Sequence, residues 1–283
     1  MPKKTVSDLA AMKAKGERLA FLAAYDAPTA SLALVAGVDV LLVGDSVGMV
    51  VYGMTTTVGV TMETMLGHVQ AVRRGAPEAF VLGDMPFNSF QPSDEEAVRN
   101  ARRFVAEAGA DAVKVEGGIA VAPRIRAIVG AGIPVMAHVG LTPQTADALG
   151  GYKVQGKTAD AAVRVVSDAA AAEAAGAFSL VLEAVPPPVA SAIRRRLAIP
   201  VYGIGAGADC DGQVLVAADV LGLLARKPPK FVKRYADLAP AIKAAFAAFA
   251  SEVREGKFPG PEHAYGMADE ERKAFEAQSG RRE

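Results

Sequence analysis

The chain has 283 residues, and its 31 Lys and Arg residues balance 31 Asp and Glu residues, so the formal net charge at pH 7 is zero. This balance, without any basic block, excludes the electrostatic footprint of a nucleic-acid-binding protein. Hydrophobic residues make up 51% of the chain, which is enough for a large core, but no apolar stretch is long enough to cross a membrane.

The single cysteine, Cys210, excludes an internal disulfide and suits a reducing compartment. The basic start "MPKK" is followed by a short apolar run that ends at Asp26. We interpret that run as a strand rather than as the apolar part of a signal peptide. A cytoplasmic protein is therefore expected.

Short apolar runs recur along the chain, each followed by a helix-like segment. Most lack polar alternation, as expected for parallel strands that are buried on both faces. The predicted strands span residues 19–25, 39–44, 79–83, 111–117, 133–140, 178–184, 199–205 and 214–223.

The segments between these runs carry helix signals. One begins at Ser93, a favourable N-cap with Glu96 three residues later, and ends at Gly109. A second, residues 158–177, has the same pattern and ends at Gly176. Strand–helix alternation repeated eight times predicts an α/β fold of the (β/α)₈ TIM-barrel type, with an open doubly wound sheet as the alternative.

Further helices are expected at both ends of the chain. Residues 5–15 precede the first strand and are predicted to cover the bottom of the barrel. An Ala-rich helix, "PAIKAAFAAFASEVREG", follows the last strand as a C-terminal extension. We predict one barrel domain over residues 1–265 and a charged tail over residues 266–283.

Two of the predicted connections are long. They run over residues 45–61 and 140–157, and both follow strands. Long loops after strands lie at the C-terminal mouth of a barrel, where active sites are found. We therefore expect the functional site at this mouth.

Acidic side chains end four of the predicted strands. Carboxylates that converge at one mouth repel one another, so at least one must take up a proton unless a cation lies among them. A hard divalent ion such as Mg²⁺ prefers oxygen ligands of this kind, whereas the scattered histidines and the single cysteine do not form a zinc site. The four acids are Asp45, Asp84, Glu116 and Glu183.

Two basic side chains accompany these acids. Lys114 lies two residues before Glu116 on the same strand, so both point to the same face. A lysine in a buried strand must be paired or functional, and a purely structural Lys–Glu pair remains the alternative. His138 ends the fifth strand, where a satisfied core histidine is the simpler interpretation. Taken alone, Asp45 also fits a turn or helix cap.

Other polar and glycine-rich features give weaker signals. "GIGAG", residues 203–207, is compatible with a phosphate-binding loop but equally with a tight turn. His68 is expected on the surface of a helix, and His263 has no assigned role.

Taken in order, a set of motifs resembles the ketopantoate hydroxymethyltransferase family over residues 19–265. "GGYKVQG" and "GLTPQ" are the most specific. The matching motifs are "AYDAPTA", "VGDSVGM", "HVQAVRRGAP", "GDMPF", "VKVEGG", "HVGLTPQ", "LGGYKVQGK", "VLEAVP", "IGAG", "DCDGQVLV", "PKFVKRY" and "FPGPEHAY".

The resemblance implies a barrel of the phosphoenolpyruvate-mutase type, one Mg²⁺ per subunit and a homo-oligomer, usually a decamer. It implies transfer of a one-carbon unit from 5,10-methylenetetrahydrofolate to 3-methyl-2-oxobutanoate, giving 2-dehydropantoate for pantothenate. By motif, Asp45, Asp84 and Glu116 would form the metal site, and Glu183 would accept a proton. The substrate would contact Asp45, Ser46, Asp84, Lys114 and His138.

Together, the acids and the resemblance suggest a mechanism. The metal at Asp45 and Asp84 would polarise the ketone of the 2-oxo acid and stabilise the enolate that forms when Glu183 removes the C3 proton. The enolate carbon would then attack the methylene carbon of the folate.

Two other functions remain open. One is a carbon–carbon lyase or phosphonate mutase on the same barrel, which a reactive cysteine in a mobile loop would favour. The other is a non-enzymatic binding or assembly protein.

The sequence departs from the family pattern at one place. Ala218-Asp219 stands where many members of the family have His-Asp. The residues that would bind folate are not evident from the sequence.

Overall fold

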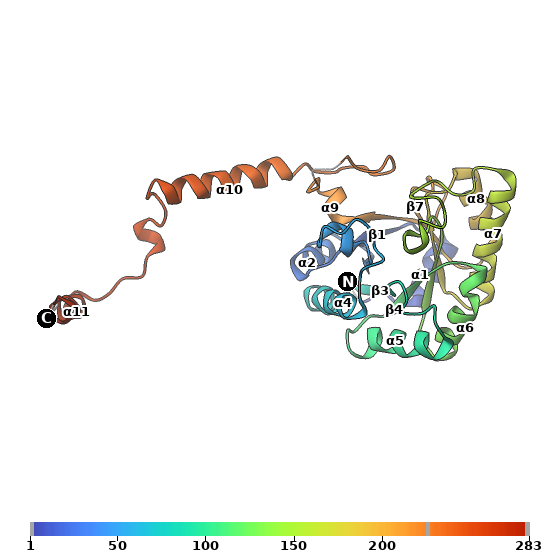
Figure 1. Cartoon of the computed structure of the whole chain (residues 1–283), viewed down its shortest axis with the longest axis horizontal. Helices are drawn as coiled ribbons and strands as arrows, with labels where there is room; N and C mark the ends of the chain where they lie inside the picture. The colour runs from blue at the N-terminus through green and yellow to red at the C-terminus, as the bar shows by residue number, and fades with distance from the viewer. Residues whose placement is uncertain (1–2, 225–226, 281–283) are drawn as a thin grey trace. The chain divides into compact units, whose positions relative to one another are not determined.

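The computed structural model describes residues 3–224 and 227–280. Its strands form a closed parallel barrel in the order β1 to β8 (Figure 1). This confirms the predicted (β/α)₈ barrel over the open sheet. The strands are β1 Leu19–Ala23, β2 Val40–Val43, β3 Phe80–Asp84, β4 Ala112–Glu116, β5 Val135–Gly140, β6 Ser179–Glu183, β7 Val201–Ile204 and β8 Gly212–Val216.

Helices follow the strands and pack around the outside of the barrel (Figure 1). Short 3₁₀ turns lie at Ile119–Val121, Pro143–Thr145 and Pro261–His263. The α-helices are α1 Val6–Lys15, α2 Ala27–Val35, α3 Val47–Val50, α4 Met62–Gly75, α5 Asp94–Ala106, α6 Ala122–Gly130, α7 Ala159–Ala174, α8 Pro187–Arg196, α9 Ala217–Val220, α10 Ala239–Arg254 and α11 Asp269–Ser279.

The predicted helix caps explain where α5 and α7 begin. Ser93 Oγ accepts a hydrogen bond from Glu96 N at 3.1 Å, and Thr158 Oγ1 accepts one from Ala161 N at 3.3 Å. Helix α5 then packs closely on β3, since a Cβ atom at Gly83 would lie 2.5 Å from the Phe104 ring. Glycine at this position lets the helix approach the strand.

Helix α1 lies at the N-terminal end of β7, as expected for a helix below the barrel. Lys13 Nζ donates to the carbonyls of Leu197 and Ile199 at 2.9 and 2.6 Å and pairs with Asp211 at 3.3 Å. The Asp211 carboxylate, 2% exposed, accepts a hydrogen bond from Val201 N. One lysine thus donates hydrogen bonds to two carbonyls that lie between α8 and β7, outside the helix and the strand.

The prediction for the eighth strand was wrong at its end. We expected strand over residues 214–223, but β8 stops at Val216 and α9 occupies Ala217–Val220. Because a short apolar run has no clear period, it fits a buried helical turn as well as a strand. The early turn places Asp219 at the mouth of the barrel.

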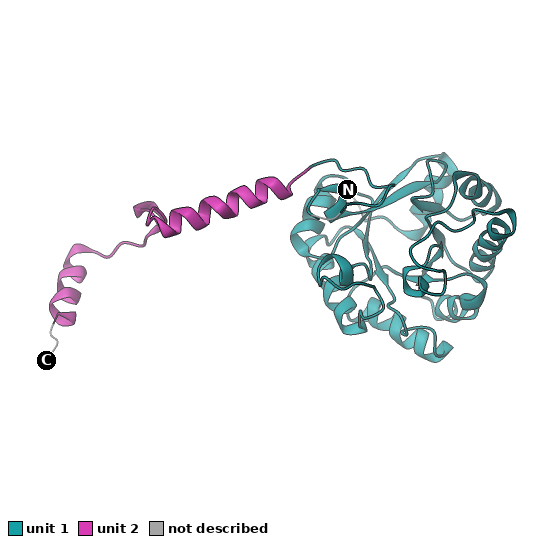
Figure 2. Ribbon diagram, turned by 45° about the horizontal axis from the view of Figure 1, so that its top comes forward, with its two compact units in different colours: residues 1–236 teal, residues 237–283 magenta. Residues whose placement is uncertain are grey.

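The chain divides into two compact units, Met1–Ala236 and Asp237–Glu283 (Figure 2). The predicted boundary at residue 265 follows the extent of the motifs and stays a prediction. Residues 1–2, 225–226 and 281–283 of the predicted domain and tail lie outside the described ranges. No helix within those ranges has the length and apolar character needed to cross a membrane.

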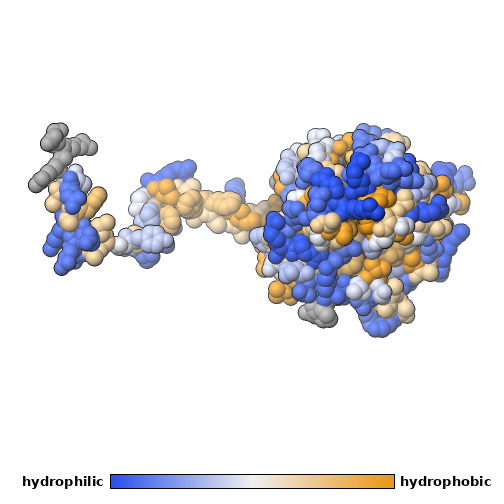
Figure 3. All heavy atoms as spheres, turned by 90° about the horizontal axis from the view of Figure 1, so that it is seen from below, coloured by the Kyte–Doolittle hydropathy of each residue, from blue (hydrophilic) through white to orange (hydrophobic). Residues whose placement is uncertain are grey.

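Helix α10 of the second unit carries exposed apolar side chains on one face. Ile242, Phe246, Phe249 and Val253 follow a spacing of four, three and four residues, which is the spacing of a helical stripe. Apolar atoms along this helix are visible in Figure 3, whereas hydrophilic side chains form broad patches on the face of the barrel unit shown there. Such a stripe is typical of a surface that contacts another protein chain.

Candidate active site

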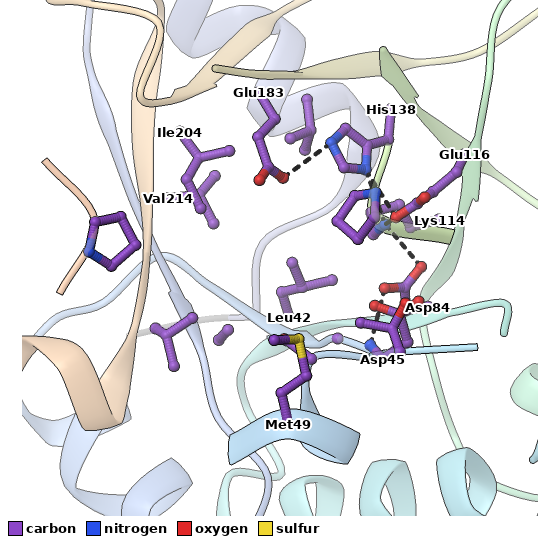
Figure 4. A pocket seen from close by; sticks show the side chains of 18 of the residues that line it. Leu42, Asp45, Met49, Asp84, Lys114, Glu116, His138, Glu183, Ile204 and Val214 are labelled. Carbon is purple, nitrogen blue, oxygen red and sulfur yellow. Dashed lines mark hydrogen bonds and ion pairs between the residues drawn. The ribbon is translucent and has the colours of Figure 1, made fainter. Parts of the chain in front are cut away.

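A cavity opens at the C-terminal ends of the strands, where the loops predicted to surround the site begin. Charged side chains line one side of this cavity, and apolar side chains from β2, β7 and β8 line the other (Figure 4). The cavity and its open mouth contain about 920 Å³ of empty space. The apolar residues labelled in Figure 4 are Leu42, Met49, Ile204 and Val214.

The barrel register explains how the charged residues meet. Asp84 on β3 lies opposite Lys114 on β4, and Glu116 on β4 lies opposite His138 on β5. Lys114 Nζ lies 2.8 Å from Asp84 Oδ1 and 3.1 Å from Glu116 Oε1. The predicted common face of Lys114 and Glu116 is therefore confirmed.

Three of the four predicted acids form a tight buried cluster. One carboxylate oxygen from each of Asp45, Asp84 and Glu116 lies within 4.8 Å of the others. These side chains are at most 5% exposed. The spacing and the oxygen-only chemistry fit a hard divalent cation such as Mg²⁺.

The electrostatics of the cluster also fit a cation. Burial, together with the charges of Asp84 and Glu116, raises the pKa of Asp45 well above its usual range. Burial also raises the pKa of Asp84 despite the nearby Lys114. For Glu116, burial is outweighed by Lys114 and His138, and its pKa falls to about 2. A divalent ion would favour the charged form of all three acids.

His138 connects this cluster to the fourth acid. Its Nδ1 lies 3.1 Å from Glu116 Oε1, and its Nε2 lies 3.2 Å from Glu183 Oε2. The histidine is 3% exposed, so the core interpretation was right about burial. Its two acidic neighbours nevertheless place it inside the charged wall of the cavity. Glu183 is the more open acid, with a side chain 16% exposed.

Gln144 is a site residue that the sequence analysis missed. Its Nε2 donates to Asp45 Oδ2 at 3.0 Å and to the Met85 carbonyl at 2.9 Å. Its backbone N–H donates to Glu116 Oε2 at 3.0 Å. One residue therefore orients two acids of the cluster. The motif "GLTPQ" contained it and was the available signal.

Ser46, which was predicted to bind the substrate, also lines the cavity. Ser46 lines it together with Lys114, His138 and Glu183. His68, expected on a helix surface, is instead partly buried, and its Nδ1 lies 2.6 Å from the Tyr25 carbonyl oxygen. The expectation of a plain surface residue was therefore wrong, because helix periodicity does not show contacts with other segments.

The glycine-rich segment 203–207 is packed tightly against other residues. Gly205 and Gly207 have φ values of +69° and +87°. A Cβ atom at Gly205 would lie 2.7 Å from the Phe231 ring, and one at Gly207 would lie 2.9 Å from Pro187. This supports the tight turn, while the phosphate-binding alternative remains untested.

Solved structures share this fold. Phosphonopyruvate hydrolase, solved as a complex with oxalate and Mg²⁺, aligns with a TM-score of 0.60 at 17% identity, covering 98% of this chain and 100% of that one. Phosphoenolpyruvate phosphomutase of Streptomyces platensis subsp. rosaceus aligns with a TM-score of 0.61 at 18% identity, covering 98% and 96%. At these identities the likeness establishes the barrel alone.

Relatives found by sequence share a much higher identity with this chain than these structures do. The 3-methyl-2-oxobutanoate hydroxymethyltransferase of Heliobacterium modesticaldum is 56% identical over 259 residues, covering 92% of this chain and 94% of the relative. The enzyme of the same name from Moorella thermoacetica is 55% identical over 261 residues, covering 92% and 97%. A family model described as ketopantoate hydroxymethyltransferase matches residues 3–261. The chain therefore belongs to the ketopantoate hydroxymethyltransferase family, whose members are hydroxymethyl-transferring enzymes.

Proposed function

We propose that this enzyme transfers a one-carbon unit from 5,10-methylenetetrahydrofolate to 3-methyl-2-oxobutanoate and so forms 2-dehydropantoate for pantothenate synthesis. The observation that carries the proposal is the buried cluster of Asp45, Asp84 and Glu116 at the barrel mouth. The choice of acceptor is supported by family membership, since relatives of 55–56% identity are named for 3-methyl-2-oxobutanoate.

Asp45 and Asp84 would hold Mg²⁺, and Glu116 would complete the site. When bound, the ion supplies positive charge for the ketone and carboxylate oxygens of the 2-oxo acid. Gln144 fixes the orientation of Asp45 and of Glu116 through its two donors. Such outer contacts keep the acids in place before an ion binds.

The remaining residues of the cavity would bind and orient the 2-oxo acid. Lys114 offsets the negative charge of the substrate carboxylate, and Ser46 donates a hydrogen bond to it. His138 contributes positive charge on the same wall. Across the cavity, Ile204 and Val214 face Lys114 and His138 (Figure 4) and would contact the branched aliphatic part of the acid.

Glu183 would remove the proton from C3 of the 2-oxo acid. The proton moves to a Glu183 carboxylate oxygen, and the electron pair left at C3 forms the new bond to the methylene carbon of the donor. The bonds from that carbon to the folate nitrogens break. One water supplies the hydroxyl oxygen, so that the products are 2-dehydropantoate and tetrahydrofolate.

The proposal includes self-association and a cytoplasmic location. The exposed stripe on α10, with Phe246 69% and Phe249 57% exposed, supports a homo-oligomer. A decamer is the size that the family resemblance implies, and sedimentation analysis would measure it. The single cysteine is compatible with the reducing cytoplasm.

The proposed function is tested by product formation. Purified protein is incubated with Mg²⁺, 3-methyl-2-oxobutanoate and 5,10-methylenetetrahydrofolate, and 2-dehydropantoate is measured by mass spectrometry. Omission of each component in turn is the control. Product without folate or without the 2-oxo acid would contradict the proposal, as would undiminished turnover in chelator.

The same incubation tests the alternatives. A lyase or phosphonate mutase would cleave or rearrange another 2-oxo acid and form no 2-dehydropantoate. Its marker, a reactive cysteine, is not supported here, because Cys210 is 1% exposed and is not among the residues that line the cavity. A binding protein would turn over neither substrate.

A further inference from the structure

The hydroxyl of Ser46 does not cap the helix that follows it, although its place in the chain predicts a cap. Ser46 stands at the N-cap of α3, where a serine oxygen normally accepts a hydrogen bond from a helix N–H. Its side chain makes no such bond. Instead, Ser46 Oγ lies 2.7 Å from the Tyr25 hydroxyl. The hydroxyl is therefore held by a side chain from the end of β1.

The backbone leaves room for this position. A Cβ atom at Gly44 would lie 2.8 Å from Ser46 Oγ, closer than a carbon and an oxygen can approach. Glycine at position 44 thus permits the observed place of the hydroxyl. Both residues line the cavity, so the hydroxyl stands where a ligand oxygen can reach it.

Tyr25 is suited to donate to this hydroxyl. It is 5% exposed, and burial raises the pKa of its phenol, which therefore keeps its proton. A hydroxyl group has one proton to donate and can also accept. If Tyr25 donates to Ser46 Oγ, the proton of Ser46 is left for an acceptor in the cavity.

His68 on α4 contacts two chain segments, the one after β1 and the one after α3. Its Nδ1 lies 2.6 Å from the Tyr25 carbonyl oxygen, and its Nε2 lies 3.0 Å from the Tyr52 hydroxyl. A carbonyl can only accept, so Nδ1 of His68 carries a proton and donates to Tyr25. Tyr52 follows α3, so one imidazole connects the segment after β1, which carries Tyr25, to the segment that leaves the Ser46 turn.

We propose that Tyr25 and His68 are positioning residues for substrate binding. Tyr25 orients Ser46 so that its hydroxyl donates to the carboxylate of the 2-oxo acid, and His68 fixes the backbone of Tyr25. The inference deepens the proposed function and rests on it, because it takes Ser46 to contact that substrate. The alternative is that Tyr25 and His68 only stabilise the fold.

A double-mutant cycle separates the two roles. Tyr25→Phe should raise KM for the 2-oxo acid about three- to tenfold with little change in kcat, the effect of one lost hydrogen bond. In a Ser46→Ala background, Tyr25→Phe should have no further effect on KM, because both variants break the same chain of contacts. Additive effects, or an unchanged KM in Tyr25→Phe, would overturn the proposal. Tyr265→Phe, a fully exposed tyrosine, is the matched control.

A pair of His68 variants tests the second link. His68→Ala should raise KM, and His68→Asn should recover much of the loss, because its amide nitrogen lies near the place of Nδ1. Equal defects in the two variants at equal thermal midpoints would contradict the link. Should Tyr25→Phe fail to fold, the cycle is run with His68→Ala and Ser46→Ala.

The wild-type protein separates failure of this inference from failure of the proposed function. Absence of 2-dehydropantoate from the wild-type reaction would reject the proposed function itself. Normal wild-type turnover with an unchanged KM in the Tyr25 and His68 variants would reject the positioning role alone.

Discussion

The imidazole of His138 lies between two carboxylates, with Nε2 at 3.2 Å from Glu183 Oε2 and Nδ1 at 3.1 Å from Glu116 Oε1. Burial and Lys114 oppose a charge on this ring, but Glu116 and Glu183 outweigh them, and the pKa of His138 rises to about 9. A protonated ring can donate to both acids. It thereby ties the proposed base to the proposed metal site.

Loss of the base should slow proton removal. Glu183→Gln keeps the size of the side chain but cannot accept the C3 proton, so the exchange of that hydrogen for deuterium in the 2-oxo acid should slow by about 10²–10⁴. The exchange is followed by NMR in D₂O with Mg²⁺ and without folate. Exchange at the wild-type rate would rule out Glu183 as the base. Glu270→Gln, an exposed change, is the control.

His138 should affect the same exchange through Glu183. His138→Ala removes the donor that orients the base, and a loss of about 10–100-fold is expected for a supporting contact of this kind. His138→Gln can place an amide N–H near the former Nε2 and should restore part of the rate. Identical rates in His138→Ala and wild type would show that Glu183 needs no such support.

Much of this site could be predicted from the sequence, because parallel strands end at one mouth. The run "LLVGDS" placed Asp45 there without any contact information. Gln144 could not be found in the same way, since its partner Asp45 is 99 residues away and it lies in a 3₁₀ turn. The contact of His68 with Tyr25 was missed for a similar reason, because Tyr25 is 43 residues earlier in the chain. The predicted end of the eighth strand was wrong because an apolar run alone does not distinguish strand from helix.

Gln144 should determine how well the metal site is formed. Gln144→Ala removes the donor to Asp45 Oδ2, and Mg²⁺ affinity should fall about 10–100-fold while the backbone donor to Glu116 remains. Calorimetric titration of the 2-oxo-acid-free protein measures the change directly. Gln155→Ala, whose side chain bonds only the Lys153 carbonyl among the described residues, serves as the control. Equal affinities for Mg²⁺ in the two variants would contradict a supporting role.

Lys114 should stabilise the fold most when no divalent ion is present. Lys114→Met leaves Asp84 and Glu116, both buried, without their cation. In chelator, the free energy of unfolding should fall by about 3–5 kcal/mol, the cost of breaking a buried ion pair. Mg²⁺ should restore part of that loss, because it would supply positive charge to the same carboxylates. Urea unfolding with and without Mg²⁺ measures both values, and a loss that Mg²⁺ does not reduce would argue against metal binding at these acids.

Cys210 should be unreactive at neutral pH. Its side chain is 1% exposed, and burial, with Asp211 nearby, raises the pKa of the thiol to about 11. Only the thiolate attacks alkylating reagents, so native protein at pH 8 should react far more slowly than unfolded protein, whose thiol has a pKa of about 8.5. Because the folded pKa is the higher one, this thiol contributes stability that is fully present below the unfolded pKa and is lost as the pH rises through about 11. Mass spectrometry after iodoacetamide treatment between pH 7 and 10 follows the reaction, with Cys210→Ser as the blank. Rapid labelling of native protein at pH 8 would show that the thiol is accessible and would reopen the cysteine-dependent lyase reaction as an alternative.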